Sequence, residues 1–453
     1  MAKLEKDLTQ GNVIRQLVMF ALPFMLSNLI QSLYNVADML IVGKFGGPVG
    51  ISAVNIGGQV TFLMTNLVIG LSVGGTVVIA QYLGYGDRKA VNESIGTLLI
   101  ALLAAAVAMT AIMLCVSTPI LHLIQTPEES FAQAREYLDI TIMGTVFIFG
   151  YNALSAIMRG VGDSKRPMYF VLIACVTNIV LDLILVGGFR MGARGAAVAT
   201  VISQALSMVL CIIYLKRNDF IFDFKISSFQ FKKERFKTLM RVGIPTSIQN
   251  VATNMSFLVL TALVNGFGVS ASAALGVVGK FNSFAILPSI AVGSSVSAMA
   301  AQNIGANELD RAKKTFHTGL MLAMGISIPI FLVAQLFPEQ IIRIFDDDAD
   351  MVRSGMEYMR TFTFDYLVAP ISFCINGLIT GAGHTAFASV NGILSALGFR
   401  IPFALLFGMA LPLGLTGIGL AAPIASGGAV LIGLIFYLSG RWKNSTVVKG
   451  KMG

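Results

Sequence analysis

Two carboxylic acids lie inside long apolar segments of this 453-residue sequence, where an ionised side chain is costly and by default marks a function. Asp38 lies toward the end of the first apolar segment, and Asp182 lies in the fifth, four residues after Asn178. This spacing places Asn178 and Asp182 on one helical face, one turn apart. Two carboxyl groups close together in apolar surroundings would hold a proton or a small cation. Alternatively, each acid lies near a helix end and is solvated.

Polar, aromatic and methionine side chains punctuate the same segments and could line a wide cavity of mixed polarity. Methionine and aromatic residues suit loosely specified ligands, although each amide could equally join two helices. The candidate cavity residues are Gln31, Tyr34, Asn35, Met64, Asn152, Gln249, Asn254, Lys280, Asn282 and Asn376.

Two prolines inside apolar segments, Pro23 and Pro245, are candidate hinges, because proline removes a helix hydrogen bond and bends the chain. Such a bend can also be static. Three charged residues lie inside apolar segments of the second half: Lys280, Asp365 and Arg400. They could form a network that changes partners between conformations, or they could snorkel or form a static ion pair.

Motifs for enzymatic chemistry are absent from the sequence. It contains no phosphate-binding Gly-x-x-x-x-Gly-Lys-Ser/Thr loop and no His-Glu-x-x-His element, and its three histidines lie in or near different loops. We therefore expect no enzymatic activity, no cofactor and no resident metal. A sodium ion at the carboxylates remains possible.

The elements that must position these residues are membrane-spanning helices. The sequence is 55% hydrophobic and 12% charged, whereas soluble domains carry about 25% charged residues. Its apolar runs match the thickness of a bilayer core. They predict an all-α polytopic membrane protein with twelve transmembrane helices, near residues 13–41, 51–82, 91–117, 133–158, 167–187, 195–215, 238–265, 271–302, 312–337, 355–379, 386–410 and 416–440.

The two halves of the sequence resemble each other at a near-constant offset of 221–222 residues. Pro23 corresponds to Pro245, and Gly84 corresponds to Gly305. Each repeat has an even number of helices, so both enter the membrane from the same side and are related by an axis along its normal. We expect a six-helix lobe over residues 1–215, a cytoplasmic linker over 216–236 and a second six-helix lobe over 237–453. A cleft between two such bundles is the architecture of alternating access.

The acids are not repeated. At the same offset, Leu260 takes the place of Asp38, and Phe403 takes the place of Asp182. This asymmetry favours a function located in the first half.

The net charge of +9 does not indicate a nucleic-acid partner, because most of the 32 Lys and Arg residues lie in alternate connecting segments. That asymmetry is typical of cytoplasmic loops. It predicts a multi-pass protein of the cell membrane with both termini in the cytoplasm.

Several short segments resemble those of multidrug and toxic compound extrusion (MATE) transporters. They are the run from Pro23 through Gln31, Asn35 and Asp38 to Gly43, the Gln81-x-x-Gly84 end of the second helix, and the Arg159-Gly160-x-Gly162-Asp163 loop. The sequence is most similar to the DinF-type branch, whose cation site corresponds here to Asp38, Asn178, Asp182 and Thr200. The acids of the NorM-type branch would fall at Thr253 and at Ala369 or Pro370.

The resemblance implies export of organic, often cationic, small molecules in exchange for protons or sodium, by a monomer in the lipid bilayer. A proton is our first choice for the coupling ion, because the site offers two carboxylates and few further oxygens. The alternatives are a flippase for lipid-linked precursors and, beyond transport, a membrane receptor or scaffold.

Overall fold

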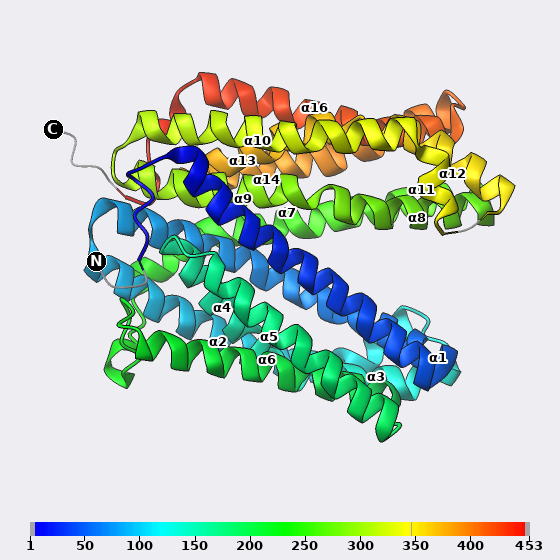
Figure 1. The fold of residues 1–453 in the computed structure, drawn as a ribbon, viewed down its shortest axis with the longest axis horizontal. Helices are drawn as coiled ribbons and strands as arrows, with labels where there is room; N and C mark the ends of the chain where they lie inside the picture. Colours follow the sequence, from blue (N-terminus) through cyan, green and yellow to red (C-terminus); the bar gives the residue numbers. More distant parts are fainter. Residues whose placement is uncertain (1–4, 346, 449–453) are drawn as a thin grey trace. The chain divides into compact units, whose positions relative to one another are not determined.

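The computed structural model describes residues 5–345 and 347–448, which form helices and loops and contain no β-strand (Figure 1). The helices of the first repeat are α1 (Val13–Tyr85), α2 (Arg88–Leu123), α3 (Glu128–Met143), α4 (Thr145–Gly160), α5 (Lys165–Asp182) and α6 (Gly192–Arg217). Those of the second repeat are α7 (Lys233–Asn265), α8 (Val269–Ala285), α9 (Leu287–Gly305), α10 (Leu309–Leu336), α11 (Pro338–Arg343), α12 (Ala349–Phe362), α13 (Asp365–Gly381), α14 (Thr385–Ile393), α15 (Ile401–Leu405) and α16 (Gly414–Leu438). Short π-helical stretches continue α5 and flank α15.

Helix α1 combines the first two predicted spans. Its 73 residues would extend about 110 Å at ~1.5 Å per residue, against a bilayer core of about 30 Å. The helix breaks at Gly47, where φ is 67° and ψ is −166°, a conformation that glycine adopts without a Cβ penalty. The loop expected near residues 42–50 is therefore reduced to a break at one residue.

The described residues contain nine helical segments long and apolar enough to cross a membrane, and eleven when each of two bent helix pairs counts as one span. Dividing α1 at Gly47 makes twelve, as the sequence predicts. The bent pairs are α3–α4, at 49°, and α12–α13, at 44°. Because they are the fourth spans of the two repeats, the duplication extends to a shared bend.

Packing divides the chain into two compact units. Unit 1 comprises the chain up to Asp7, Leu26–Ile79 and Asp87–Gly243, and unit 2 comprises Leu8–Met25, Ala80–Gly86 and the chain from Ile244. Each unit contains most of one repeat, but unit 2 also holds both ends of α1. The boundaries expected for the lobes and linker remain a prediction, and residues 1–4 and 449–453 lie outside the described residues.

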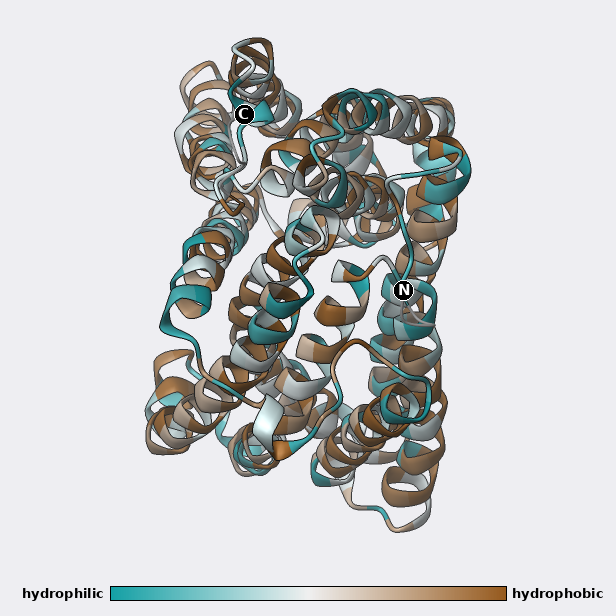
Figure 2. Ribbon diagram, turned by 90° about the vertical axis from the view of Figure 1, so that its left-hand side faces the viewer, coloured by the Kyte–Doolittle hydropathy of each residue, from teal (hydrophilic) through white to brown (hydrophobic). Residues whose placement is uncertain are grey.

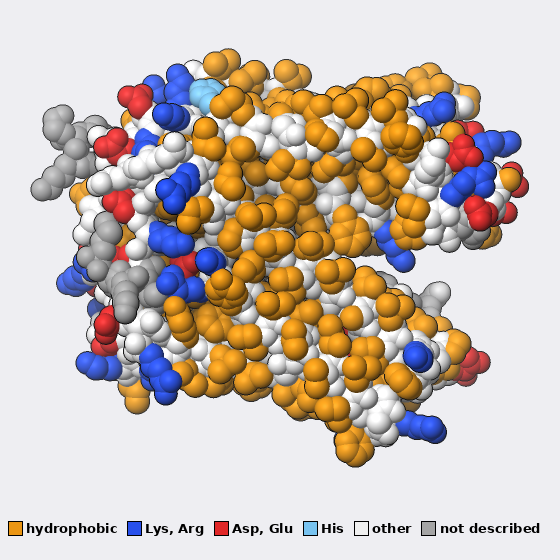
Figure 3. Space-filling model, in the orientation of Figure 1, with side chains coloured by type: hydrophobic (Ala, Val, Ile, Leu, Met, Phe, Trp, Pro, Cys, Tyr) orange, Lys and Arg blue, Asp and Glu red, His pale blue; other side chains and the backbone are white. Residues whose placement is uncertain are grey.

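The surface of each unit is apolar where a membrane would surround it. Large hydrophobic side chains such as Leu40, Leu258 and Ile435 are exposed along the helices. Hydrophobic side chains cover the middle of the helices, and Lys and Arg gather toward the helix ends (Figure 3). The ribbon coloured by hydropathy shows hydrophobic residues recurring along the helices (Figure 2). This arrangement is that of a multi-pass membrane protein.

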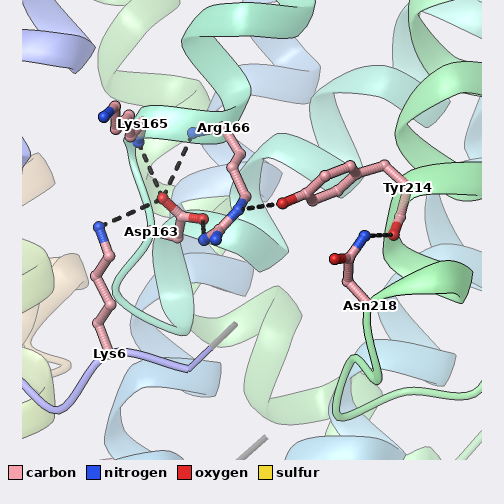
Figure 4. A network of polar contacts seen from close by, with 6 residues as sticks. All are labelled: Lys6, Asp163, Lys165, Arg166, Tyr214 and Asn218. Carbon is pink, nitrogen blue, oxygen red and sulfur yellow. Dashed lines mark hydrogen bonds and ion pairs between the residues drawn. The ribbon is translucent and has the colours of Figure 1, made fainter. Parts of the chain in front are cut away.

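Asp163, in the loop before α5, has a structural role in unit 1. Asp163 is buried and accepts hydrogen bonds from the backbone N–H groups of Lys165 and Arg166, at 3.1 and 3.4 Å. It also forms ion pairs with Arg166 and with Lys6, the latter at 3.7 Å (Figure 4). Arg166 in turn donates to the Tyr214 hydroxyl at 2.8 Å. Asp163 therefore fixes the start of α5, the helix that carries Asp182.

Candidate functional site

The candidate site lies within unit 1, where α1, α5 and α6 meet. Asp38 comes from α1, Asn178 and Asp182 come from α5, and Thr200 comes from α6. Both aspartates and Asn178 are buried, with at most 6% of each exposed. Helix α6 packs against α5. Gly195 of α6 lies close to Leu185 and Val186 in the π-helical stretch that continues α5, and a small residue of this kind lets two helices approach closely.

The carboxyl groups of Asp38 and Asp182 lie close enough to share a hydrogen bond. An ionised carboxylate can only accept hydrogen bonds, so this contact needs a proton or a cation between the two groups. Each aspartate also has one buried oxygen without a partner among the described residues. The pair is therefore a candidate site for one small positive charge.

Asn178 and Thr200 orient the carboxyl group of Asp182. With the Asn178 amide in the orientation that satisfies both of its ends, its nitrogen donates to Asp182 Oδ2 at 2.8 Å. Its oxygen then accepts from the backbone N–H of Thr200 at 3.2 Å. The Thr200 hydroxyl lies 3.0 Å from the hydroxyl of Tyr34. These groups supply carboxylate, amide and hydroxyl oxygens, which also suit a sodium ion.

Two tyrosines complete the surroundings of this site. Tyr34 is predicted from the sequence to line a substrate cavity, but its hydroxyl contacts Thr200 beside the carboxyl pair. Tyr137, from α3, lies close enough to interact electrostatically with Asp38 and Asp182. Tyr34 and Asp38 are four residues apart, so a helix places them on the same face, and this spacing could have indicated that Tyr34 lies near the acid. No comparable spacing in the sequence indicates Tyr137.

Comparison with known proteins identifies the family. The family model for MatE matches residues 23–184 and again residues 245–406. The chain belongs to the MatE family. The two matches confirm the internal duplication, and their starting points are Pro23 and Pro245.

Relatives of the chain cover nearly its whole length. The probable multidrug resistance protein YpnP of Bacillus subtilis is 30% identical over 437 residues, which are 96% of this chain and 97% of that protein. The probable multidrug resistance protein NorM of Thermotoga maritima is 27% identical, over 96% and 94% of the two chains. MATE proteins are multidrug efflux transporters, and the chain is a multi-pass membrane member of this family.

Solved MATE structures share the fold. The outward-facing conformation of a multidrug resistance MATE family transporter matches with a TM-score of 0.89 and 23% identity, over 96% of this chain and 97% of that chain. A MOP superfamily transporter from Pyrococcus furiosus matches with the same TM-score and identity, over 98% of both chains.

The other predicted cavity residues of this MATE chain are dispersed among several helices in both units. Gln31, Asn35 and Lys280 are exposed, Met64 is buried, and the remaining residues are partly buried. Asn152 and Asn254 donate to carbonyls one turn earlier in their own helices, those of Ile148 and Asn250, at 2.8 and 2.9 Å. Whether these residues share one substrate cavity remains a prediction, as does the role of Pro23 and Pro245 as hinges.

The charged residues of unit 2 do not form the expected trio. Arg400 and Asp365 are both buried and interact electrostatically. Lys280 is exposed on α8 and is not part of this buried pair, which agrees with the snorkelling alternative. Its flexible four-carbon side chain can carry the ammonium group to solvent.

Proposed function

We propose that this MATE transporter exports organic, often cationic, compounds by antiport with protons or sodium ions through alternating access. The observation that carries the proposal is the buried contact between the Asp38 and Asp182 carboxyl groups. Two carboxyl groups can lie this close only when a proton or cation is bound between them. Uptake of the ion can therefore be linked to a conformational change that brings the two groups together. The DinF-type branch is the one whose cation site these residues match.

The cycle follows from charge neutralisation. Facing outward, Asp38 and Asp182 take up the coupling ion, and their mutual repulsion is removed. Helix α1 then bends or shifts at Pro23. This movement closes the space that the substrate occupied, and the substrate is released. The affinity for the ion must differ between the two conformations, because an ion bound equally well in both shifts no equilibrium. A proton is the first choice for the coupling ion, and Asn178 and Thr200 would complete an oxygen shell for sodium.

The protein is proposed to act as a monomer in the cell membrane, with both termini and the segment before α7 in the cytoplasm. The proposal rests on the distribution of Lys and Arg in the sequence. Its substrates are small organic molecules taken from the cytoplasm or the inner leaflet.

Efflux from proteoliposomes tests the coupling. A pH gradient and a sodium gradient are imposed separately, and export of a fluorescent organic cation is followed. Asp182→Asn should abolish gradient-driven export, because the amide cannot gain or release the coupling proton, while elution in size-exclusion chromatography stays monodisperse. Asp347→Asn is the matched control, since its side chain is exposed. Full export by Asp182→Asn would overturn the proposed site.

A further inference from the structure

Unit 2 contains a buried arginine, Arg400, that has no close acidic partner among the described residues. Arg400, at the end of the π-helical stretch Leu394–Arg400, is 8% exposed, as is Asp365. The two interact electrostatically, but within the described part of the chain neither forms an ion pair at 4.0 Å or less. A guanidinium stays charged in proteins, so its charge lacks compensation at short range.

One edge of the Arg400 guanidinium is unused. Nη1 donates to the Ser256 hydroxyl at 3.0 Å, and the guanidinium carbon lies 4.5 Å from the centre of the Phe257 ring. Nε is buried without a hydrogen-bond partner. Nε and Nη2 share the edge opposite Nη1, and this planar edge is the one that can bind a carboxylate through two parallel hydrogen bonds.

Neighbouring polar groups are also unsatisfied. Oδ1 of Asp365 and the hydroxyl of Tyr366 are buried and lack a partner among the described residues. The remaining polar contact of Asp365 is with Ser426. Buried donors and acceptors without partners cost free energy, so a cluster with both kinds is suited to bind a ligand that offers the complementary groups.

Unit 2 also contains a cavity of about 300 Å³, which is connected with this cluster through two aromatic residues of its wall. Its aromatic lining includes Phe257, which carries the stacked guanidinium, and Tyr358, which interacts electrostatically with both Arg400 and Asp365. Asn282 and Thr261 add polar groups to its wall. The volume is at the lower end of the ~300–1,000 Å³ typical of small-molecule pockets and would accept an aromatic ring system.

We infer that Arg400 is a binding residue for the carboxylate of exported compounds, whose aromatic part occupies the cavity beside Phe257 and Tyr358. The inference rests on the proposed export function and extends it to acidic and zwitterionic aromatic compounds. An amine on the same compound would satisfy the free oxygen of Asp365. The competing explanation is an Arg400–Asp365 ion pair that forms only in another conformation.

Two probes that differ in one group test the inference. A rhodamine with a free carboxylate and its methyl ester have the same aromatic cation, and only the first offers the carboxylate. Their binding to purified full-length protein in detergent is measured by fluorescence anisotropy, which needs no ion gradient. Arg400→Gln should weaken binding of the acid about tenfold or more, as expected for a charge-assisted hydrogen bond, and change binding of the ester less than about twofold.

The remaining variants separate the outcomes. Arg400→Lys should restore part of the affinity for the acid, because it keeps the charge but not the planar fork. If Arg400→Gln does not fold, Arg400→Lys gives the same comparison of acid with ester, because it also removes the planar fork. Equal weakening of both probes, or no effect on either, would overturn the inference and favour a conformational ion pair. Asp347→Asn, at an exposed position, should leave binding of both probes unchanged. The comparison of acid with ester uses no ion gradient, so failure of the proposed coupling site would be seen only in the efflux assay.

Discussion

At the scale of single residues, the site in unit 1 is built from a repulsive pair and the groups that hold it in place. Asp38 and Asp182 would separate if both were ionised, since like charges in apolar surroundings repel strongly. Asn178 holds Asp182 through its amide, and Thr200 holds Asn178 through its backbone N–H. Occupation by a proton or cation therefore changes the force between α1 and α5, and this change is what coupling requires.

Tyr34→Phe tests the outer part of this arrangement. The change removes the hydroxyl that contacts Thr200 and leaves the ring in place. A net loss of about 0.5–1.5 kcal/mol per hydrogen bond predicts a ~2- to 10-fold change in apparent affinity for the coupling ion. The measurement is the dependence of efflux on external proton or sodium concentration. Tyr169→Phe, at an exposed position, should behave as wild type, and an unchanged ion dependence in Tyr34→Phe would remove Tyr34 from the site.

At the scale of elements, two glycines allow the ends of α1 and α9 to cross closely within unit 2. A Cβ on Gly84, near the end of α1, would overlap the carbonyl of Gln302, and a Cβ on Gly305, at the end of α9, would overlap that of Gln81. These four residues are equivalent pairs in the two repeats. Each Gln-x-x-Gly segment therefore packs its glycine against the backbone of the other segment. Glycine is required at both positions because a side chain would not fit between the two backbones.

Gly84→Ala is predicted to destabilise the protein, because its Cβ meets backbone that cannot rotate away. Overpacking of this kind costs about 1–3 kcal/mol. Gly58→Ala is the matched control in the same helix, where a Cβ would meet nothing within 4 Å. Alanine there should stabilise the helix by up to ~1 kcal/mol. Thermal unfolding in detergent distinguishes them, and equal midpoints for the two variants would contradict the close crossing.

At the scale of the whole molecule, α1 belongs to both compact units. Its start is held in unit 2, where Arg311 donates to the carbonyls of Leu8, Gln10 and Gly11 at 3.1, 2.8 and 2.8 Å. The helix passes into unit 1 at Leu26 and carries Asp38 there. A force on Asp38 can therefore act on the anchored end, and Pro23 lies just before the residue at which the helix changes unit.

Pro23→Ala should slow efflux while the fold is retained. Alanine restores the N–H that proline lacks, so the helix becomes stiffer at that point and more stable by up to ~3 kcal/mol. The initial rate of export and the thermal midpoint are measured together. Pro329→Ala is the control, because α10 lies entirely within unit 2. An unaltered export rate in Pro23→Ala would exclude Pro23 as a hinge.

The sequence by itself determined the membrane fold, the duplication and the acids of the site. In an apolar run of bilayer length, a helix satisfies all backbone hydrogen bonds within the segment, so the run predicts a helix. The positions of Asn178 and Asp182 on one face then follow from helical periodicity alone. These features are local or periodic, so they can be predicted without knowing which helices touch.

Tertiary structure decided the rest, because contacts between distant segments have no local signature. Only the folded chain brings Asp38 to Asp182 and places Tyr34 on Thr200. It also buries Arg400 without an ion pair among the described residues, and leaves Lys280 exposed on α8. The same holds for α1, whose apolar pattern cannot reveal that its two ends pack in one unit and its middle in the other. Packing of side chains that lie far apart in the sequence sets these features, and a single sequence does not record such pairs.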